Sequence, residues 1–177
     1  WTKDSAKGER LARRIEAGIA KVGMTVEKIL LTHGHIDHAA GAAELKEKLG
    51  GIPIEGPHEE DKFLLDSLVE SGFAFGMTDA RNVTPDRWLA EGDTVTVAGA
   101  TFSILHCPGH SPGSVAYVNA AQRFALIGDV LFRGSIGRTE GLPQAGHAML
   151  IESIKTKLLP LGDDLASVLA GTRAHVD

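Results

Sequence analysis

The sequence has little of what several protein classes require. A single cysteine, Cys107, excludes an intrachain disulfide framework and fits a reducing compartment. No apolar run approaches the length of a membrane span, so a membrane protein is not expected. The net charge is −5 and the basic residues are scattered, a pattern that gives no footprint for nucleic acid. No signal peptide is visible, although the chain begins with Trp1, and a cytoplasmic protein is therefore expected.

The composition is that of an ordinary globular protein, with 43% hydrophobic and 23% charged residues. A chain of 177 residues suits one domain with a proper core, and no repeat, linker or low-complexity tract divides it. We therefore expect a single domain over residues 1–177. Helical spacing is present at 9–22, 39–49, 59–71 and 147–159, and short strand-like runs at 26–31, 52–54, 94–97, 101–106, 114–119 and 124–127. This order predicts an α/β protein whose sheets are covered by helices.

Three histidines and one carboxylate stand within six residues, between the first strand-like run and an Ala-rich helical segment: His33, His35, Asp37 and His38. Neutral imidazole and carboxylate are the ligands that Zn²⁺ takes, so this density predicts a metal site. If the alternation of the strand persists into the loop, His33 and His35 project to one side, while Asp37 and His38 point elsewhere. Each set could then hold one metal ion. The alternative is a solvated loop with unrelated histidines.

Two later segments offer further ligands at strand ends. In H-C-P-G-H-S-P-G-S, residues 106–114, His110 is the expected ligand, whereas His106 is still in strand register and is favoured as a core or supporting residue. In L-I-G-D-V-L-F, residues 126–132, Asp129 follows an apolar strand. It could simply cap a turn, but a buried carboxylate is costly unless it is paired or binds a cation. We therefore favour Asp129 as a ligand that bridges two metal ions.

Together these spaced motifs resemble those of metallo-β-lactamase-fold hydrolases, specifically the small glyoxalase II-like branch. The H-x-H-x-D-H loop of that family is matched at residues 33–38, its later histidine within G-H-S-P-G-S, and its bridging aspartate within G-D-V-L-F, followed by G-R at Arg138. The resemblance implies an αββα sandwich with the metals at one edge of the two sheets. It also implies a ligand set for each metal: His33, His35, His110 and Asp129 for the first, and Asp37, His38 and Asp129 for the second.

The chemistry implied by the resemblance is thioester hydrolysis, for example of S-lactoylglutathione to D-lactate and glutathione. A metal-activated water is the expected nucleophile, and a second cation polarises the carbonyl. Asp37 is the expected catalytic residue, because it would both bind the second metal and orient that water. Two divalent ions are expected, with zinc favoured and iron or manganese as alternatives. Cys107 is interpreted as a structural thiol.

The two ends of the sequence depart from the family pattern. Its opening strands and D-P-G-G segment are not recognisable before residue 10, and its last ligand turn, P-G-H-G-P, is missing from an ending that holds His175 instead. Codons such as GCC-GGG-ACA-CGG-GCC-CAC-GTC-GAC would encode residues 170–177, and read one nucleotide later they would give P-G-H-G-P. We therefore expect a frameshift near residue 169. Three alternatives remain open: a persulfide dioxygenase-like enzyme with one iron, a nucleic-acid-processing relative, and an inactive fragment that serves as a binding module.

Overall fold

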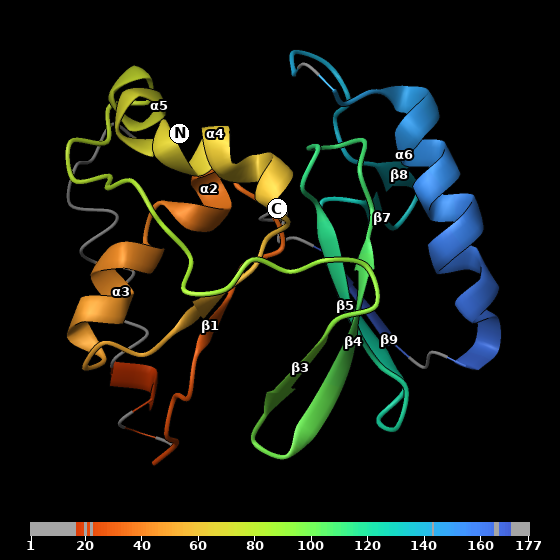
Figure 1. Ribbon diagram of the computed structural model, residues 1–177, viewed down its shortest axis with the longest axis horizontal. Helices are drawn as coiled ribbons and strands as arrows, with labels where there is room; N and C mark the ends of the chain where they lie inside the picture. Colours follow the sequence, from red (N-terminus) through yellow and green to blue (C-terminus); the bar gives the residue numbers. More distant parts are fainter. Residues whose placement is uncertain (1–16, 20, 22, 143, 165–166, 171–177) are drawn as a thin grey trace.

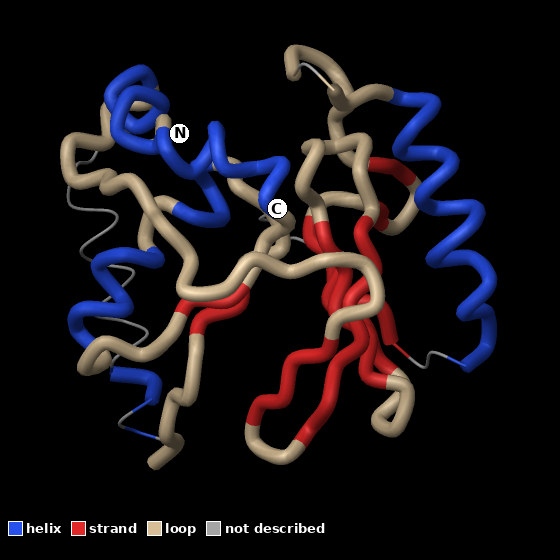
Figure 2. Tube along the Cα trace, viewed as in Figure 1, coloured by secondary structure: helices blue, strands red, loops and turns tan. Residues whose placement is uncertain are grey.

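The computed structural model describes residues 17–19, 21, 23–142, 144–164 and 167–170. Figure 1 shows two sheets facing each other, with helices on the outer side of each, and Figure 2 shows the same layers by element type. On one outer side lie α2 (Ile36–Ala39), α3 (Ala42–Lys48), α4 (Lys62–Asp66) and α5 (Leu68–Ala74), and on the other lies α6 (His147–Ser153). The predicted sandwich, with sheets between helical layers, is confirmed.

The first sheet pairs two short strands in parallel, β1 (Ile29–Leu30) and β2 (Ile54–Glu55). Both fall within or beside runs that the sequence predicts as strands. Helices α2 to α5 bury apolar side chains against this sheet, in a cluster that includes Leu31, Ile54 and Leu65. The connection through helices is expected, because parallel strands cannot be joined by a tight turn.

The second sheet has five described strands in the order β3 (Thr94–Val97), β4 (Ala100–His106), β5 (Val115–Asn119), β6 (Phe124–Gly128) and β9 (Ser167–Ala170). All pairs are antiparallel except β6 with β9. Strand β5 is buried throughout because it lies between the first sheet and α6. Its alternate residues serve two cores: Val115 and Tyr117 pack toward Leu30, whereas Ala116 and Val118 join the cluster under α6.

The helices begin and end at different residues from those predicted. The segment predicted over 59–71 is broken at Ser67, whose hydroxyl donates to the Phe63 carbonyl oxygen at 2.9 Å. A 3₁₀ turn, η1 (Glu59–Asp61), precedes α4, and α6 continues as a π-helical segment, η2 (Ile154–Leu158), and a 3₁₀ segment, η3 (Leu159–Asp164). In the described part of the chain, no helix combines the length and apolar character needed to cross a membrane.

Several sequence predictions fall outside the described residues. The helix predicted over 9–22 is described only at residues 17–19 and 21, which are helical. The strands predicted to be missing before residue 10, the ending that holds His175 and most of the segment affected by the predicted frameshift lie outside the described ranges.

The two sheets are joined where the first strand leads into the histidine loop. The Val115 N–H donates to the Thr32 carbonyl oxygen at 2.8 Å, and the buried Tyr117 hydroxyl donates to the Leu31 carbonyl oxygen at 2.7 Å. Gly56 makes this approach possible, because a side chain there would collide with the Tyr117 hydroxyl and the Leu31 carbonyl. A small hairpin, β7 (Leu131–Phe132) and β8 (Ser135–Ile136), follows β6 at the same edge.

Candidate metal centre

The predicted ligands come from four places in the fold that meet at this edge. His33 and His35 follow β1, and His38 lies on α2. His110 lies in the turn between β4 and β5, and Asp129 directly follows β6. The first sheet thus supplies one half of the cluster and the second sheet the other.

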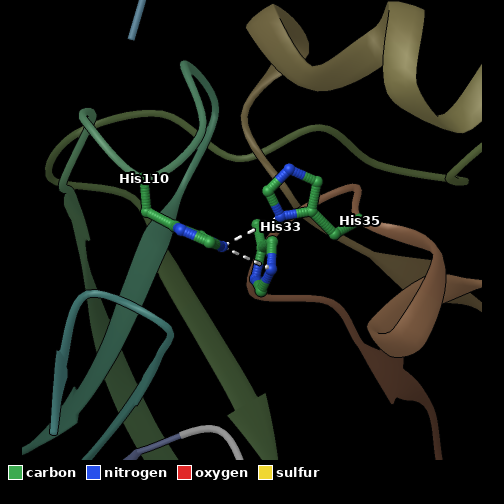
Figure 3. A group of neighbouring side chains, drawn as sticks. All are labelled: His33, His35 and His110. Atoms are coloured by element: carbon green, nitrogen blue, oxygen red, sulfur yellow. Dashed lines mark hydrogen bonds between the residues drawn. The ribbon is translucent and has the colours of Figure 1, made fainter. Parts of the chain in front are cut away.

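Three ring nitrogens converge in the first group (Figure 3). His110 Nε2 lies 2.9 Å from His35 Nδ1 and 3.3 Å from His33 Nε2. A tetrahedral zinc ion with Zn–N bonds of 2.0–2.1 Å would place neighbouring ligand atoms about 3.3 Å apart. The spacing and the chemistry of these donors therefore fit a divalent metal ion.

The tautomer of His110 is fixed by the backbone. Its Nδ1 lies 2.8 Å from the Arg138 carbonyl oxygen, which can only accept, so Nδ1 carries the proton and Nε2 keeps its lone pair for a metal. The same contact gives Arg138 a structural role through its backbone carbonyl. Gly137 is required beside it, because a side chain at that position would overlap the Asp129 carbonyl oxygen and press on His110.

The electrostatics of the first group favour neutral imidazoles. Burial, followed by the neighbouring histidines, holds the pKa of His33 well below its ordinary value. Burial, then His110, lowers the pKa of His35 to about 4, against an ordinary value of 6.5. Neutral rings are the form that binds metal, so protons compete little for these nitrogens at neutral pH.

A second group consists of His33, His38 and Asp129. Asp129 Oδ1 lies 3.3 Å from His38 Nε2, and its Oδ2 lies 3.8 Å from His110 Nε2. Burial alone would lower the pKa of His38, but the hydrogen bond and charge of Asp129 raise it. Because its two oxygens face histidines of different groups, Asp129 is placed as a bridging ligand would be.

His33 lies closer to His38 than strand alternation predicts. Its ring centroid is 4.1 Å from that of His38, although the spacing predicts that they point apart. The reason is that α2 begins at Ile36, three residues before the predicted helix, and the His38 N–H already donates to the His35 carbonyl oxygen at 3.0 Å. This turn brings His38 back beside His33.

Asp37 lies at the open side of the cluster. Its side chain is 65% exposed, and its Oδ2 lies 3.8 Å from His38 Nε2. It faces the same histidine as Asp129 but makes no closer contact with the groups above. Its expected roles as second-metal ligand and catalytic residue therefore remain predictions.

Two features near the ligands were not predicted as functional. Asp61 is a fully buried carboxylate that contacts both ligand loops, yet the sequence E-E-D-K around it is typical of a solvated helix start. A third group of ligand-type side chains, His58, Glu60 and His106, lies nearby. His106 Nε2 lies 2.8 Å from the Pro112 carbonyl oxygen, so it is the donor there and has no lone pair for a metal. His106 thus supports the turn that carries His110, as the sequence favoured.

Cys107 is expected to be unreactive in the folded protein. The side chain is buried, and burial raises the pKa of its thiol to about 12, so at pH 8 about one thiol in ten thousand is ionised. Iodoacetamide at pH 8 should therefore label the native chain far more slowly than the urea-unfolded chain, as measured by mass spectrometry. Equal labelling rates in the two states would contradict the structural role assigned to this thiol.

Comparison with known proteins agrees with this geometry. The sequence model of the Metallo-beta-lactamase superfamily matches residues 9–173. Hydroxyacylglutathione hydrolase GloC of Haemophilus influenzae is 43% identical over 166 residues, which cover 93% of this chain and 75% of that protein.

Two solved structures share the fold and more than 30% of the sequence. BLEG-1 B3 metallo-beta-lactamase has a TM-score of 0.79 and 33% identity, covering 91% of this chain and 76% of its own. TTHA1623, solved in a di-iron-bound form, has a TM-score of 0.77 and 36% identity, covering 90% of this chain and 76% of its own. These likenesses confirm the resemblance that the spaced motifs predicted.

Proposed function

The chain belongs to the metallo-beta-lactamase superfamily, and from this membership we propose that it is a metal-dependent hydrolase of thioesters. The observation that carries the proposal is the convergence of three ring nitrogens, His33 Nε2, His35 Nδ1 and His110 Nε2, next to the carboxylate of Asp129. We propose two divalent ions at this edge, one held by the three histidines with Asp129 and the other by Asp37, His38 and Asp129.

Bound divalent ions supply an activated water at neutral pH and polarise the carbonyl of the substrate. The residues of the chain hold and orient the groups that would bind these ions. The Arg138 carbonyl holds the ring of His110 in one tautomer, and Asp129 contacts histidines of both groups. The exposed carboxylate of Asp37 would orient the attacking water and hold its proton, because it lies at the solvent side of the cluster.

The substrate class is supported by similarity to GloC, which is named a hydroxyacylglutathione hydrolase. We therefore propose S-lactoylglutathione as a first substrate, with the thioester bond cleaved to D-lactate and glutathione. Zinc suits the His and carboxylate donors, and the di-iron form of TTHA1623 makes iron the second candidate metal.

Elemental analysis of the purified chain, together with an assay of S-lactoylglutathione hydrolysis, tests the proposal. We expect two metal ions per chain, release of glutathione, and loss of that activity after chelation with recovery on adding Zn²⁺. A single iron per chain with sulfite production from a persulfide would instead favour a persulfide dioxygenase-like enzyme. A folded chain with no bound metal and no thioester hydrolysis would overturn the proposal and favour the inactive binding module instead.

A further inference from the structure

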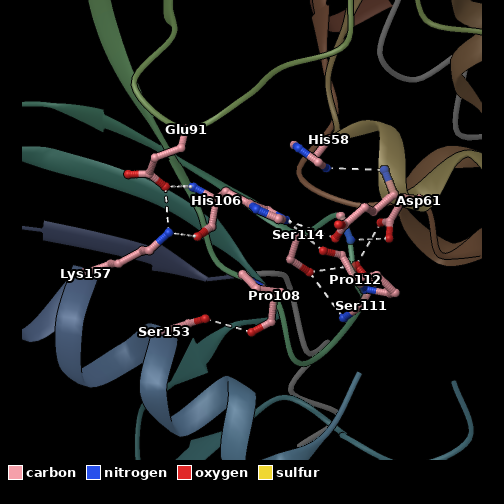
Figure 4. A network of polar contacts seen from close by, with 12 residues as sticks. His58, Asp61, Glu91, His106, Pro108, Ser111, Pro112, Ser114, Ser153 and Lys157 are labelled. Atoms are coloured by element: carbon pink, nitrogen blue, oxygen red, sulfur yellow. Dashed lines mark hydrogen bonds and ion pairs between the residues drawn. The ribbon is translucent and has the colours of Figure 1, made fainter. Parts of the chain in front are cut away.

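The carboxylate of Asp61 accepts hydrogen bonds from both loops that carry the three-histidine group. Its Oδ2 accepts from the Gly34 N–H at 2.7 Å and from the Ser111 hydroxyl at 2.8 Å. Figure 4 shows Asp61 beside Ser111. Its Oδ1 accepts from the Gly113 N–H at 2.6 Å. The side chain is completely buried, so these donors replace the water that a carboxylate would otherwise hold.

Two of these three donors lie next to a proposed metal ligand, and the third, Gly113, lies in the same turn as His110. Gly34 stands between His33 and His35, and Ser111 directly follows His110. The first loop follows β1, and the second joins β4 to β5, so the two come from different sheets. One carboxylate therefore ties together the two segments whose ring nitrogens must converge on one ion.

The backbone around Asp61 packs closely against the same two loops. The His58 N–H donates to the Gly113 carbonyl oxygen at 3.1 Å, which reciprocates the contact from Gly113 to Asp61. A side chain at Gly113 would collide with the Asp61 N and the His58 carbonyl, and one at Gly34 would press on Asp61 and Leu64. Both glycines thus allow η1 to approach the ligand loops closely.

Three hydrogen-bond donors face the Asp61 side chain, so both of its terminal atoms must be acceptors. An ionised carboxylate accepts at both oxygens, whereas an asparagine would turn an N–H₂ toward one of these donors. The neighbouring Lys62 pairs with Asp66 rather than with Asp61. Burial raises the pKa of the Asp61 carboxyl, and the hydrogen bonds from Ser111, Gly34 and Gly113 oppose that rise by stabilising the ionised form.

We infer that Asp61 is a positioning residue that holds the two histidine loops in the geometry of the metal site before a metal ion binds. This inference rests on the proposed function, since it concerns the same metal centre. Without Asp61, the loops remain attached to their own sheets but lose their shared anchor. Metal binding must then order them, and affinity falls even though no ligand atom has been removed.

The test compares zinc dissociation constants, measured by competition with a chromophoric chelator, and the melting temperature of the metal-free chain. Asp61→Asn should raise the dissociation constant about 10- to 100-fold, as substitutions behind metal ligands do. Asp86→Asn is the matched control, because Asp86 also accepts a backbone N–H, from Ile54 at 2.7 Å, and pairs with Lys46. It should leave the zinc dissociation constant unchanged. A lower melting temperature for Asp61→Asn with wild-type zinc affinity would show a merely structural role and overturn the inference.

A pair of serine variants tests the same contact if Asp61→Asn fails to fold. Ser111 and Ser114 are both buried in one turn and their hydroxyls are 2.7 Å apart, but only Ser111 reaches Asp61. Ser111→Ala should weaken zinc binding at least about threefold, and Ser114→Ala less than about twofold. Equal effects would overturn the role of Asp61. A wild-type chain that binds no zinc would overturn the proposed metal centre itself, whereas wild-type binding with unchanged variants would overturn only this inference.

Discussion

Replacing His33 with alanine is expected to empty the site of the metal ion held by the three histidines and to lower kcat/KM for thioester hydrolysis by about a thousandfold or more. His33 belongs to both groups of ligand-type side chains, and its ring lies 4.1 Å from that of His38 and 4.8 Å from that of His110. It is also almost completely buried, so no solvent-exposed group can take its place. The measurement is metal content per chain by elemental analysis, together with steady-state kinetics.

The matched control is His147→Ala, the same chemical change at an exposed residue in the first turn of α6. It should keep the wild-type metal content and a rate within about twofold of wild type, since exposed substitutions of this kind rarely disturb a fold. Circular dichroism of both variants separates loss of metal from loss of structure. A folded His33→Ala variant that keeps two metal ions would contradict the central position assigned to His33.

The ligand residues could be predicted from sequence because their chemistry is carried by residue type and spacing. Histidines two and three residues apart with an aspartate between them are rarely explained by packing, and the turn around His110 and the strand end before Asp129 complete the pattern. Strands β1 to β6 could be predicted for a similar reason, since each overlaps a short strand-like run bounded by turn residues, whereas the two-residue strands β7 and β8 were not predicted. The fold then places these segments at one edge.

Asp61 could not be predicted in the same way, because its role depends on where the chain folds back rather than on its neighbours in sequence. Glu59 and Glu60 beside it are exposed, and only the third acidic residue of the run is buried. The break at Ser67 has a different, local origin. The Ser67 hydroxyl donates to the Phe63 carbonyl oxygen, a hydrogen bond that competes with the helical backbone pattern and that sequence periodicity does not report.

Asp37→Asn is expected to lower kcat for thioester hydrolysis about 10²- to 10⁴-fold, the usual cost of removing a positioned general acid or base. The substitution keeps the size of the side chain but removes its charge and its capacity to take up a proton. Asp37 is suited to this role because its carboxylate is 65% exposed, at the open side of the cluster, and lies 3.8 Å from His38 Nε2. Kinetics with and without excess Zn²⁺ measure the effect.

The comparison with excess metal separates the two roles proposed for Asp37. If the residue acted only as a ligand, added Zn²⁺ would refill the weakened second site and restore the rate, because occupancy depends on metal concentration. If it also orients the attacking water, the rate stays low at full occupancy. Asp66→Asn, at another half-exposed carboxylate paired with Lys62 on α4, is the matched control and should keep the wild-type rate. A kcat for Asp37→Asn within a few-fold of wild type would remove Asp37 from the reaction and leave Asp129 as the carboxylate nearest to both groups of histidines.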